Sequence, residues 1–124
     1  MIKAGVYIHF PFCRRACFYC HFFKKKIHPD LSSDYLRHLE KEMTLRRDPG
    51  LAVDSLYIGG GSPSLLNAGQ VSGLLDHAAK SFRIESRSEI TLEANPEDLD
   101  LPLLKALRAA GVNRLSIGAQ SFQD

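Results

Sequence analysis

The chain has 124 residues, of which 44% are hydrophobic and 24% are charged, and its formal net charge is +2 at pH 7. This size and composition are typical of one globular domain or part of one, and they exclude a disordered or fibrous chain. The small net charge gives no strong reason to expect nucleic acid as a partner. No segment approaches the roughly 20 consecutive apolar residues that a membrane-spanning helix needs, so we expect no membrane span.

Strand and helix patterns alternate along the chain. The predicted strands cover residues 5–10, 55–58, 89–93 and 114–117, and the predicted helices cover residues 33–47, 67–82 and 100–110. Asp30, Ser32 or Ser33 can cap the first helix, and Asn67 with Gln70 has the spacing of a capping box at the second. Because strand and helix alternate at these lengths, we expect an α/β fold of βα units with a parallel sheet.

The two faces of the predicted strands differ in polarity. One face carries aliphatic side chains that would pack under the helices: Val6, Ile8, Leu56, Ile58, Ile90, Leu92, Leu115 and Ile117. The other face carries groups that are costly to bury against hydrocarbon: Tyr7, His9, Ser55, Tyr57, Thr91, Glu93, Ser116 and Gly118. A flat doubly wound sheet would be apolar on both faces, so we expect helices on one side and a polar, ligand-holding lumen on the other, as in a barrel.

All three cysteines of the chain, Cys13, Cys17 and Cys20, lie within eight residues after the first predicted strand. Three thiolates are one fewer than the four that close a structural zinc site or saturate a cubane iron–sulfur cluster. The count therefore predicts a metal with an open coordination position. Zinc with His21 or His28 as the fourth ligand is one alternative, and buried thiols without a metal are another.

The cysteines also bear on the cellular compartment. Their number is odd, and the chain starts with polar residues and shows no signal peptide. Both features argue against disulfides and favour a reducing compartment, so we expect a cytoplasmic location.

Three further distinctive segments follow the other predicted strands. They are residues 59–63 (GGGSP), 93–96 (EANP) and 118–121 (GAQS). Ligands of parallel α/β folds bind at the carboxyl ends of the strands, so these segments and the cysteines should share one rim. Glycines let a ligand approach their free N–H and C=O groups, Glu93 suits the two hydroxyls of a ribose, and Gln120 offers both a donor and an acceptor. An ordinary turn, a solvated carboxylate and an exposed amide are the alternatives for each segment alone.

Together these motifs resemble the radical S-adenosylmethionine (SAM) proteins, and more narrowly the oxygen-independent coproporphyrinogen III oxidase family. The stretches that carry the narrower resemblance are YIHFPFC at residues 7–13, YIGGGSPSL at 57–65, EITLEANPE at 89–97 and GVNRLSIGAQSF at 111–122. The resemblance runs from one end of the chain to the other. It implies the first four βα-type units of a partial (β/α)6 TIM-like barrel.

The resemblance also implies a role for each site residue. Cys13, Cys17 and Cys20 would hold three irons of a [4Fe-4S] cluster, and the amino and carboxylate groups of SAM would chelate the fourth. An electron from a donor such as flavodoxin or ferredoxin would then break a C–S bond of SAM, giving methionine and a 5′-deoxyadenosyl radical. The positions that match SAM contacts of the family are Tyr7 on the first strand, Tyr19 beside adenine, Gly60, Gly61 and Ser62 in the glycine segment, Glu93 at the ribose, and Gln120.

Two departures from the family bear on function. Coproporphyrinogen oxidases of this kind carry another cysteine just after the triplet, where this chain has His21 and Phe22. That feature resembles the branch of haem chaperones, which bind haem and pass it to an acceptor protein. We therefore favour a haem chaperone, with a porphyrinogen oxidase as the alternative and a zinc-binding module as the alternative of another class. Family members also continue past Asp124, so we expect residues 1–124 to be the N-terminal part of a radical SAM core domain, inactive by itself.

Overall fold

The computed structural model describes residues 3–13, 25–26 and 29–118. In chain order its elements are β1 (Lys3–Phe10), β2 (Phe12–Cys13), β3 (Lys25–Lys26), α1 (Pro29–Leu45), β4 (Asp48–Gly60), the short 3-10 helix η1 (Pro63–Leu65), α2 (Ala68–Ser81), β5 (Phe82–Ala94), the 3-10 helix η2 (Pro96–Asp98), α3 (Leu101–Ala110) and β6 (Arg114–Ile117). The predicted alternation of long strands and helices is confirmed.

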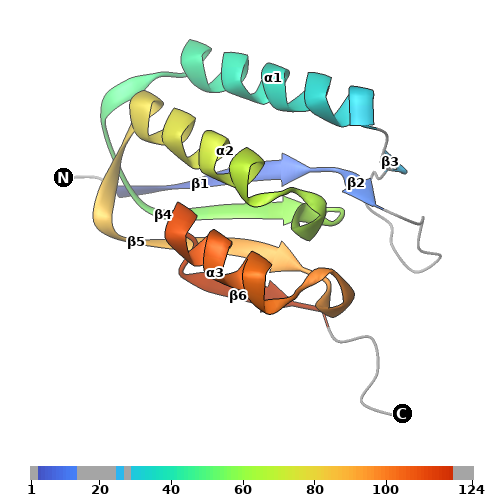
Figure 1. The fold of residues 1–124 in the computed structure, drawn as a ribbon. Helices are drawn as coiled ribbons and strands as arrows, with labels where there is room; N and C mark the ends of the chain where they lie inside the picture. Colours follow the sequence, from blue (N-terminus) through green and yellow to red (C-terminus); the bar gives the residue numbers. More distant parts are fainter. Residues whose placement is uncertain (1–2, 14–24, 27–28, 119–124) are drawn as a thin grey trace.

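The long strands form one sheet in the order β1-β4-β5-β6, and every neighbouring pair is parallel. Helices α1, α2 and α3 connect consecutive strands and all lie over the same face of the sheet (Figure 1). Parallel strands with helical crossovers of one hand place the helices in this way. The prediction of an α/β fold with a parallel sheet and helices on one side is therefore confirmed.

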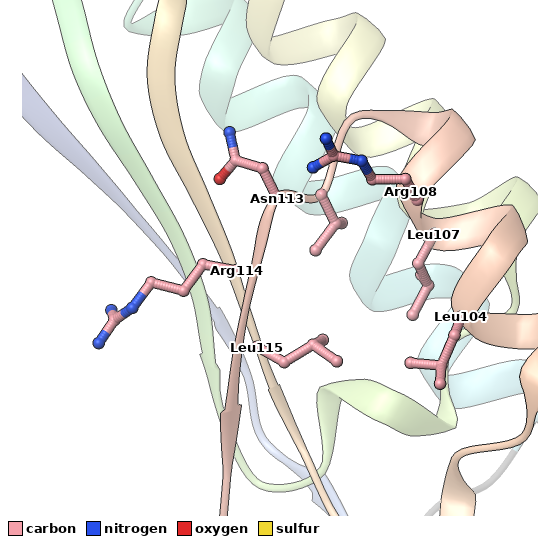
Figure 2. A pocket seen from close by; sticks show the side chains of 7 residues that line it. Leu104, Leu107, Arg108, Asn113, Arg114 and Leu115 are labelled. Carbon is pink, nitrogen blue, oxygen red and sulfur yellow. The ribbon is translucent and has the colours of Figure 1, made fainter.

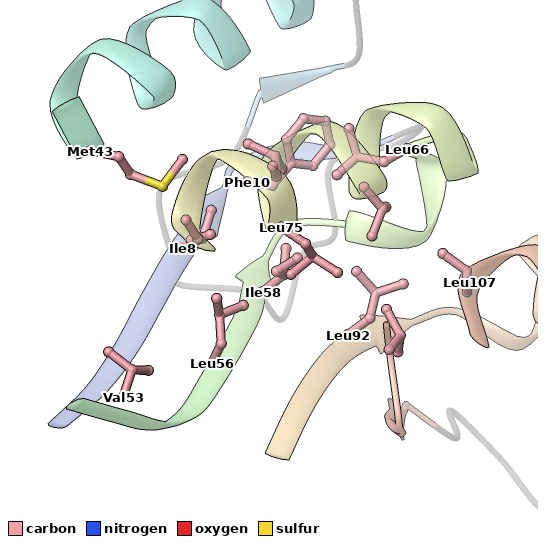
Figure 3. Packing of buried hydrophobic residues seen from close by; sticks show 14 of the residues in the cluster. Ile8, Phe10, Met43, Val53, Leu56, Ile58, Leu66, Leu75, Leu92 and Leu107 are labelled. Carbon is pink, nitrogen blue, oxygen red and sulfur yellow. The ribbon is translucent and has the colours of Figure 1, made fainter. Parts of the chain in front are cut away.

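The core lies between the helices and the apolar face of the sheet. Figure 3 shows side chains from α1 (Met43), α2 (Leu75), α3 (Leu107) and the strands (Ile8, Val53, Leu56, Ile58, Leu92) packed together. The aliphatic face predicted from the sequence is buried or half-buried along β1, β4 and β5. Ile117 is the exception, because 51% of it is exposed at the end of the edge strand β6, and the prediction that it packs under a helix is wrong.

Local signals set the ends of α2 and α3. The Asn67 side chain accepts a hydrogen bond from the backbone N–H of Gln70 at 2.8 Å, and the Gln70 side chain accepts one from the backbone N–H of Asn67 at 2.9 Å. This is the predicted capping box. Asp100 accepts from the N–H of Leu103 at the start of α3, and Gly111 ends that helix with φ of 119°.

The start of α1 differs from the prediction. The helix begins at Pro29, so Asp30, Ser32 and Ser33 lie inside it and none of them is its N-terminal cap. A proline suits the first turn because the backbone N–H that it lacks would have no partner within the helix there. None of the helices in the described part of the chain has the length and hydropathy that crossing a bilayer requires.

Strands β4 and β5 each have 13 residues and start well before the predicted ranges 55–58 and 89–93. The added part of β4 contains Pro49 and Gly50, which disfavour strands, so side-chain propensity gave no signal there. The two added parts pair with each other, with register shifts along the ladder. Backbone hydrogen bonds between the adjacent strands form these extensions, and side-chain propensity does not detect such bonds.

Candidate functional site

The carboxyl ends of β4, β5 and β6 enclose a pocket of about 160 Å³. Its lining comes from the three segments that follow these strands: Gly60, Gly61, Ser62, Pro63, Glu93, Ala94, Asn95, Ser116, Ile117 and Gly118. Segments far apart in the sequence thus meet at one rim, where parallel α/β folds bind ligands. Of the residues predicted to bind a cofactor, Gly60, Gly61, Ser62 and Glu93 lie here.

Cys13 is the first of the three cysteines and lies against the glycine segment. It is buried, with 4% of its surface exposed, and its thiol is free. A Cβ atom placed on Gly61 would lie 2.8 Å from the Cys13 Sγ and 2.6 Å from the Phe12 carbonyl oxygen. Only glycine lets the two segments approach this closely. The other predicted metal ligands, Cys17 and Cys20, lie outside the described residues, as do the predicted SAM contacts Tyr19 and Gln120.

A small parallel ladder holds the base of the cysteine segment. Phe12 of β2 pairs with Lys25 of β3, and Cys13 pairs with Lys26. The residues that enter and leave the segment are therefore adjacent. Strand β2 thus pairs with β3 and also accepts a hydrogen bond from Ser62 N–H through the Phe12 carbonyl.

The backbone N–H groups of the glycine segment already have partners inside the protein. Gly60 donates to the Glu93 carboxylate at 2.8 Å, Gly61 to the Phe10 carbonyl at 2.7 Å, and Ser62 to the Phe12 carbonyl at 2.8 Å. The expectation that these N–H groups are free for a ligand is therefore wrong. These bonds instead fix the loop. A ligand that contacts the backbone here would therefore bond to carbonyl oxygens, which accept from donors such as an ammonium group.

Glu93 is held on both carboxylate oxygens. Its Oε1 accepts from the Gly60 N–H, and its Oε2 accepts from the Tyr57 hydroxyl at 2.9 Å. A carboxylate has about four lone-pair positions, so two remain for further donors. The side chain is half-buried beside the pocket, and its orientation is set before any ligand arrives.

Two stacked tyrosines extend from Glu93 across the helix-free face of the sheet. The rings of Tyr7 and Tyr57 are 5.9 Å apart at 20°, and the Tyr7 hydroxyl lies 3.1 Å from His9 Nδ1. Burial and then the Glu93 charge raise the pKa of Tyr7 above its ordinary value. Tyr7 is 59% exposed, whereas Thr91 on the same face is buried. Tyr7 and His9 thus lie on the predicted polar face, and Tyr7 is outside the lining of the pocket.

The comparison with protein families decides the class of this protein. The model described as "Radical SAM superfamily" matches residues 7–124. The chain belongs to this superfamily. Its members in general use a [4Fe-4S] cluster and SAM, which are the two cofactors that the resemblance to this superfamily implies.

Several radical SAM relatives are similar over nearly the whole chain. The "Heme chaperone HemW" of Bacillus subtilis (strain 168) is 42% identical over 123 residues, which cover 97% of this chain and 32% of that protein. The "Oxygen-independent coproporphyrinogen III oxidase" of Escherichia coli (strain K12) is 38% identical over 121 residues, covering 95% of this chain and 26% of that protein. The predicted resemblance to this family is confirmed, and both branches of it are similar to the chain.

A solved structure agrees with the fold. The coproporphyrinogen III oxidase (HemN) from Escherichia coli, titled as a radical SAM enzyme, superimposes with a TM-score of 0.85 at 33% identity, over 98% of this chain and 29% of that one. The chain therefore has the fold of the corresponding part of a radical SAM enzyme. It spans about a third or less of the length of each of these proteins.

The residues at the pocket fit the two cofactors of the superfamily. The buried Cys13 thiol is a soft ligand of the kind that iron–sulfur clusters use, and it lies against Gly61. Gly60 and Gly61 line the pocket, and the oriented Glu93 carboxylate beside them offers acceptors to hydroxyl groups. These donors and acceptors lie at one end of the sheet.

Sequence reasoning missed a polar network beside the pocket. Asn95 donates from Nδ2 to the Ser62 hydroxyl oxygen at 2.8 Å and from its backbone N–H to the Ser64 hydroxyl oxygen at 3.0 Å. Ser64 in turn donates to Asp98 at 2.8 Å. A signal was present, because adjacent strands both end in a polar residue followed by proline, at Ser62-Pro63 and Asn95-Pro96.

A second pocket of about 290 Å³ lies between α3 and β6, on the helix-covered side of the sheet. Its apolar lining residues are Leu104, Leu107, Val112 and Leu115. In Figure 2 the leucines point into the space between helix and strand, and the Arg114 side chain points away from α3. This pocket shares no lining residue with the pocket at the rim and contains none of the predicted site residues.

Proposed function

We propose that this chain is the cofactor-binding part of a radical SAM haem chaperone, with residues 1–124 forming the N-terminal part of its core domain. Cys13, Cys17 and Cys20 bind three irons of a [4Fe-4S] cluster, and the rim pocket binds SAM. The observation that carries this proposal is the contact of Cys13 with Gly61 at the pocket. The first cluster ligand and the SAM segment are thereby neighbours in space.

Each residue of the pocket has a proposed task. The carbonyl oxygens of Gly60 and Gly61 accept from the SAM ammonium group, because their N–H groups are used within the protein. Ser62 adds a hydroxyl, and Glu93 accepts from the ribose hydroxyls with the lone pairs that Gly60 and Tyr57 leave. Tyr7, Tyr19 and Gln120 are further proposed SAM contacts.

The chemistry of the bound cofactors is one-electron reduction of the SAM sulfonium. We propose a small redox protein such as flavodoxin or ferredoxin as the electron donor, and a cytoplasmic location. The odd number of cysteines in the sequence supports a reducing compartment.

The choice of a haem chaperone rests on the residues after the cysteine triplet. This chain has His21 and Phe22 where coproporphyrinogen oxidases of this kind carry a further cysteine. A relative named as a heme chaperone is 42% identical. Haem and a haem-acceptor protein are therefore the proposed partners, and a porphyrinogen is the substrate under the alternative of an oxygen-independent coproporphyrinogen III oxidase.

Anaerobic reconstitution with iron and sulfide tests the cofactor assignment. We expect a brown protein with a broad visible absorbance band and, after reduction, an EPR signal that SAM changes. The Cys13→Ala variant should bind less iron, because it lacks one of three protein ligands. A colourless protein that takes up zinc and no cluster would point to a zinc module and overturn the proposal.

Glu93→Gln tests the role of the pocket. The substitution removes the charge and one acceptor, and we expect SAM to bind about tenfold more weakly, which corresponds to about 1.4 kcal/mol. Glu89→Gln is the matched control because Glu89 lies on the same strand, is exposed, and pairs only loosely with Arg114 at 3.4 Å. Equal SAM affinity of Glu93→Gln and the unmodified protein would argue against the pocket assignment.

Haem and porphyrinogen assays of the longer protein to which we assign this chain separate the two branches. A haem chaperone should bind haem, seen as a shift of the Soret band, and should transfer it to an apo-haemoprotein. An oxidase should instead release decarboxylated products from coproporphyrinogen when SAM and a reductant are supplied. Turnover of coproporphyrinogen without haem transfer would favour the alternative.

A further inference from the structure

The segments that follow strands β4 and β5 have the same local structure. Each ends at the rim and is followed by a polar residue, a proline and a 3-10 turn: Ser62-Pro63 leads into η1, and Asn95-Pro96 leads into η2. Proline disfavours the helical conformation of the residue before it. Asn95 accordingly keeps an extended backbone, with φ of −91° and ψ of 135°. The side-chain alternation of β5 therefore continues past the strand, and Asn95 faces the same way as Glu93.

The two polar residues bond to each other across the rim. Asn95 Nδ2 donates to Ser62 Oγ at 2.8 Å, and both residues line the pocket. Ser62 is 7% exposed, so this contact is almost fully shielded from water. Loss of a hydrogen bond is costly at such a buried place, because water cannot replace the missing partner. Because Ser62 Oγ accepts this bond, its own hydroxyl proton is available to an acceptor in the pocket.

The backbone of Asn95 is anchored independently of its side chain. Its N–H donates to Ser64 Oγ, and the Ser64 hydroxyl donates to Asp98 of η2. Ser64 is also buried, with 5% of its surface exposed. These bonds should keep η1 and η2 joined when the Asn95 side chain is removed. The effect of the Asn95 amide on Ser62 can therefore be measured without disrupting the two turns.

We propose that Asn95 is a positioning residue of the rim pocket, which orients the Ser62 hydroxyl toward an oxygen acceptor of the bound SAM. This inference rests on the proposed function. Asn95 acts through Ser62, and Glu93, two residues earlier, contacts the ligand from the same side of β5. The motif Glu-x-Asn-Pro thus combines a ligand-binding residue and a positioning residue in one strand end.

The test measures SAM binding to the anaerobically reconstituted protein by calorimetry, for Asn95→Ala, Asn95→Asp, Ser62→Ala and the double variant. Asn95→Asp keeps the size of the side chain and replaces the amide donor with an acceptor, so it reports on the hydroxyl orientation if Asn95→Ala folds poorly. Glu97→Gln is the matched control, because Glu97 is exposed on η2 and lines no part of the pocket. Cluster content and thermal unfolding without SAM are recorded for each variant.

We expect Asn95→Ala and Asn95→Asp to weaken SAM binding by about tenfold, as supporting residues behind a ligand commonly do, while cluster content is kept. In the Ser62→Ala background Asn95→Ala should weaken SAM binding no further, because the Ser62 hydroxyl that Asn95 orients is already absent. Unchanged SAM affinity in Asn95→Asp, or full additivity with Ser62→Ala, would overturn the inference and leave the proposed function intact. Failure of the unmodified protein to bind SAM would overturn both.

Discussion

The two faces of the sheet are built from alternate residues of the same strands, yet they are stabilised in different ways. On the helix-covered face, Ile58 and Leu92 are completely buried among other aliphatic side chains. On the helix-free face, Tyr57 and Glu93 are half-buried and joined by a hydrogen bond, and Tyr7 is largely exposed. Because strand side chains alternate with a period of two, one set of strands carries both the core and the site. Substitutions on the two faces should therefore affect different properties.

The largest effect on stability is expected in the core. Leu92→Ala should lower the free energy of unfolding by about 3 kcal/mol, because it removes buried methyl groups and leaves a cavity. Urea unfolding measures this loss. Leu45→Ala is the control, because Leu45 is 87% exposed at the end of α1 and should change stability by less than about 0.5 kcal/mol. Similar losses for the two variants would contradict the described core.

A smaller effect is expected where the glycine segment meets the cysteine segment. Gly61→Ala puts a methyl group within 3 Å of the Phe12 carbonyl and the Cys13 sulfur, so we expect a loss of about 2 kcal/mol and a lower iron content after reconstitution. Gly73→Ala on α2 meets nothing within 4 Å and should stabilise the protein by about 0.5–1 kcal/mol. If Gly61→Ala were as stable and as rich in iron as Gly73→Ala, the close contact would be refuted.

The smallest effect concerns pH on the helix-free face. Burial, followed by the hydrogen bond and charge of Glu93, raises the pKa of Tyr57 above its ordinary value of 10.0, although a bond to Ser116 and the charge of Arg114 act against this. The unfolded chain then loses its proton first, so the contribution of Tyr57 is fully present below pH 10 and is lost as pH rises through the folded pKa.

Tyr57→Phe should accordingly make the fall in stability between about pH 9 and about pH 11 shallower than in the unmodified protein. Urea unfolding at several pH values measures the slope. Tyr7 and Tyr35, whose pKa values burial also raises, retain their part of the fall. An unchanged slope would mean that burial and Glu93 together do not raise the pKa of Tyr57 in solution.

Much of the architecture follows from signals that are local in the sequence. The capping box of Asn67 and Gln70, the Gly111 end of α3 and the aliphatic alternation of β1 depend on residues only a few positions apart. Their physical causes are side-chain and backbone hydrogen bonds within one turn, and burial of every second residue along a strand. The early starts of β4 and β5 were not predicted, because these parts pair through backbone hydrogen bonds. The identity of the side chains gives little information about such bonds.

For the candidate site, too, some features could be predicted from the sequence and others depend on the tertiary structure. The sequence by itself determined which chemical groups are available: thiols, a glycine run, and a carboxylate at a strand end. Only the tertiary structure decided that Gly60 donates to Glu93, 33 residues away, and that Asn95 reaches Ser62 over the same separation. Those bonds depend on the distance between adjacent strands and on their register, which packing of the helices against the sheet sets and which no single segment encodes.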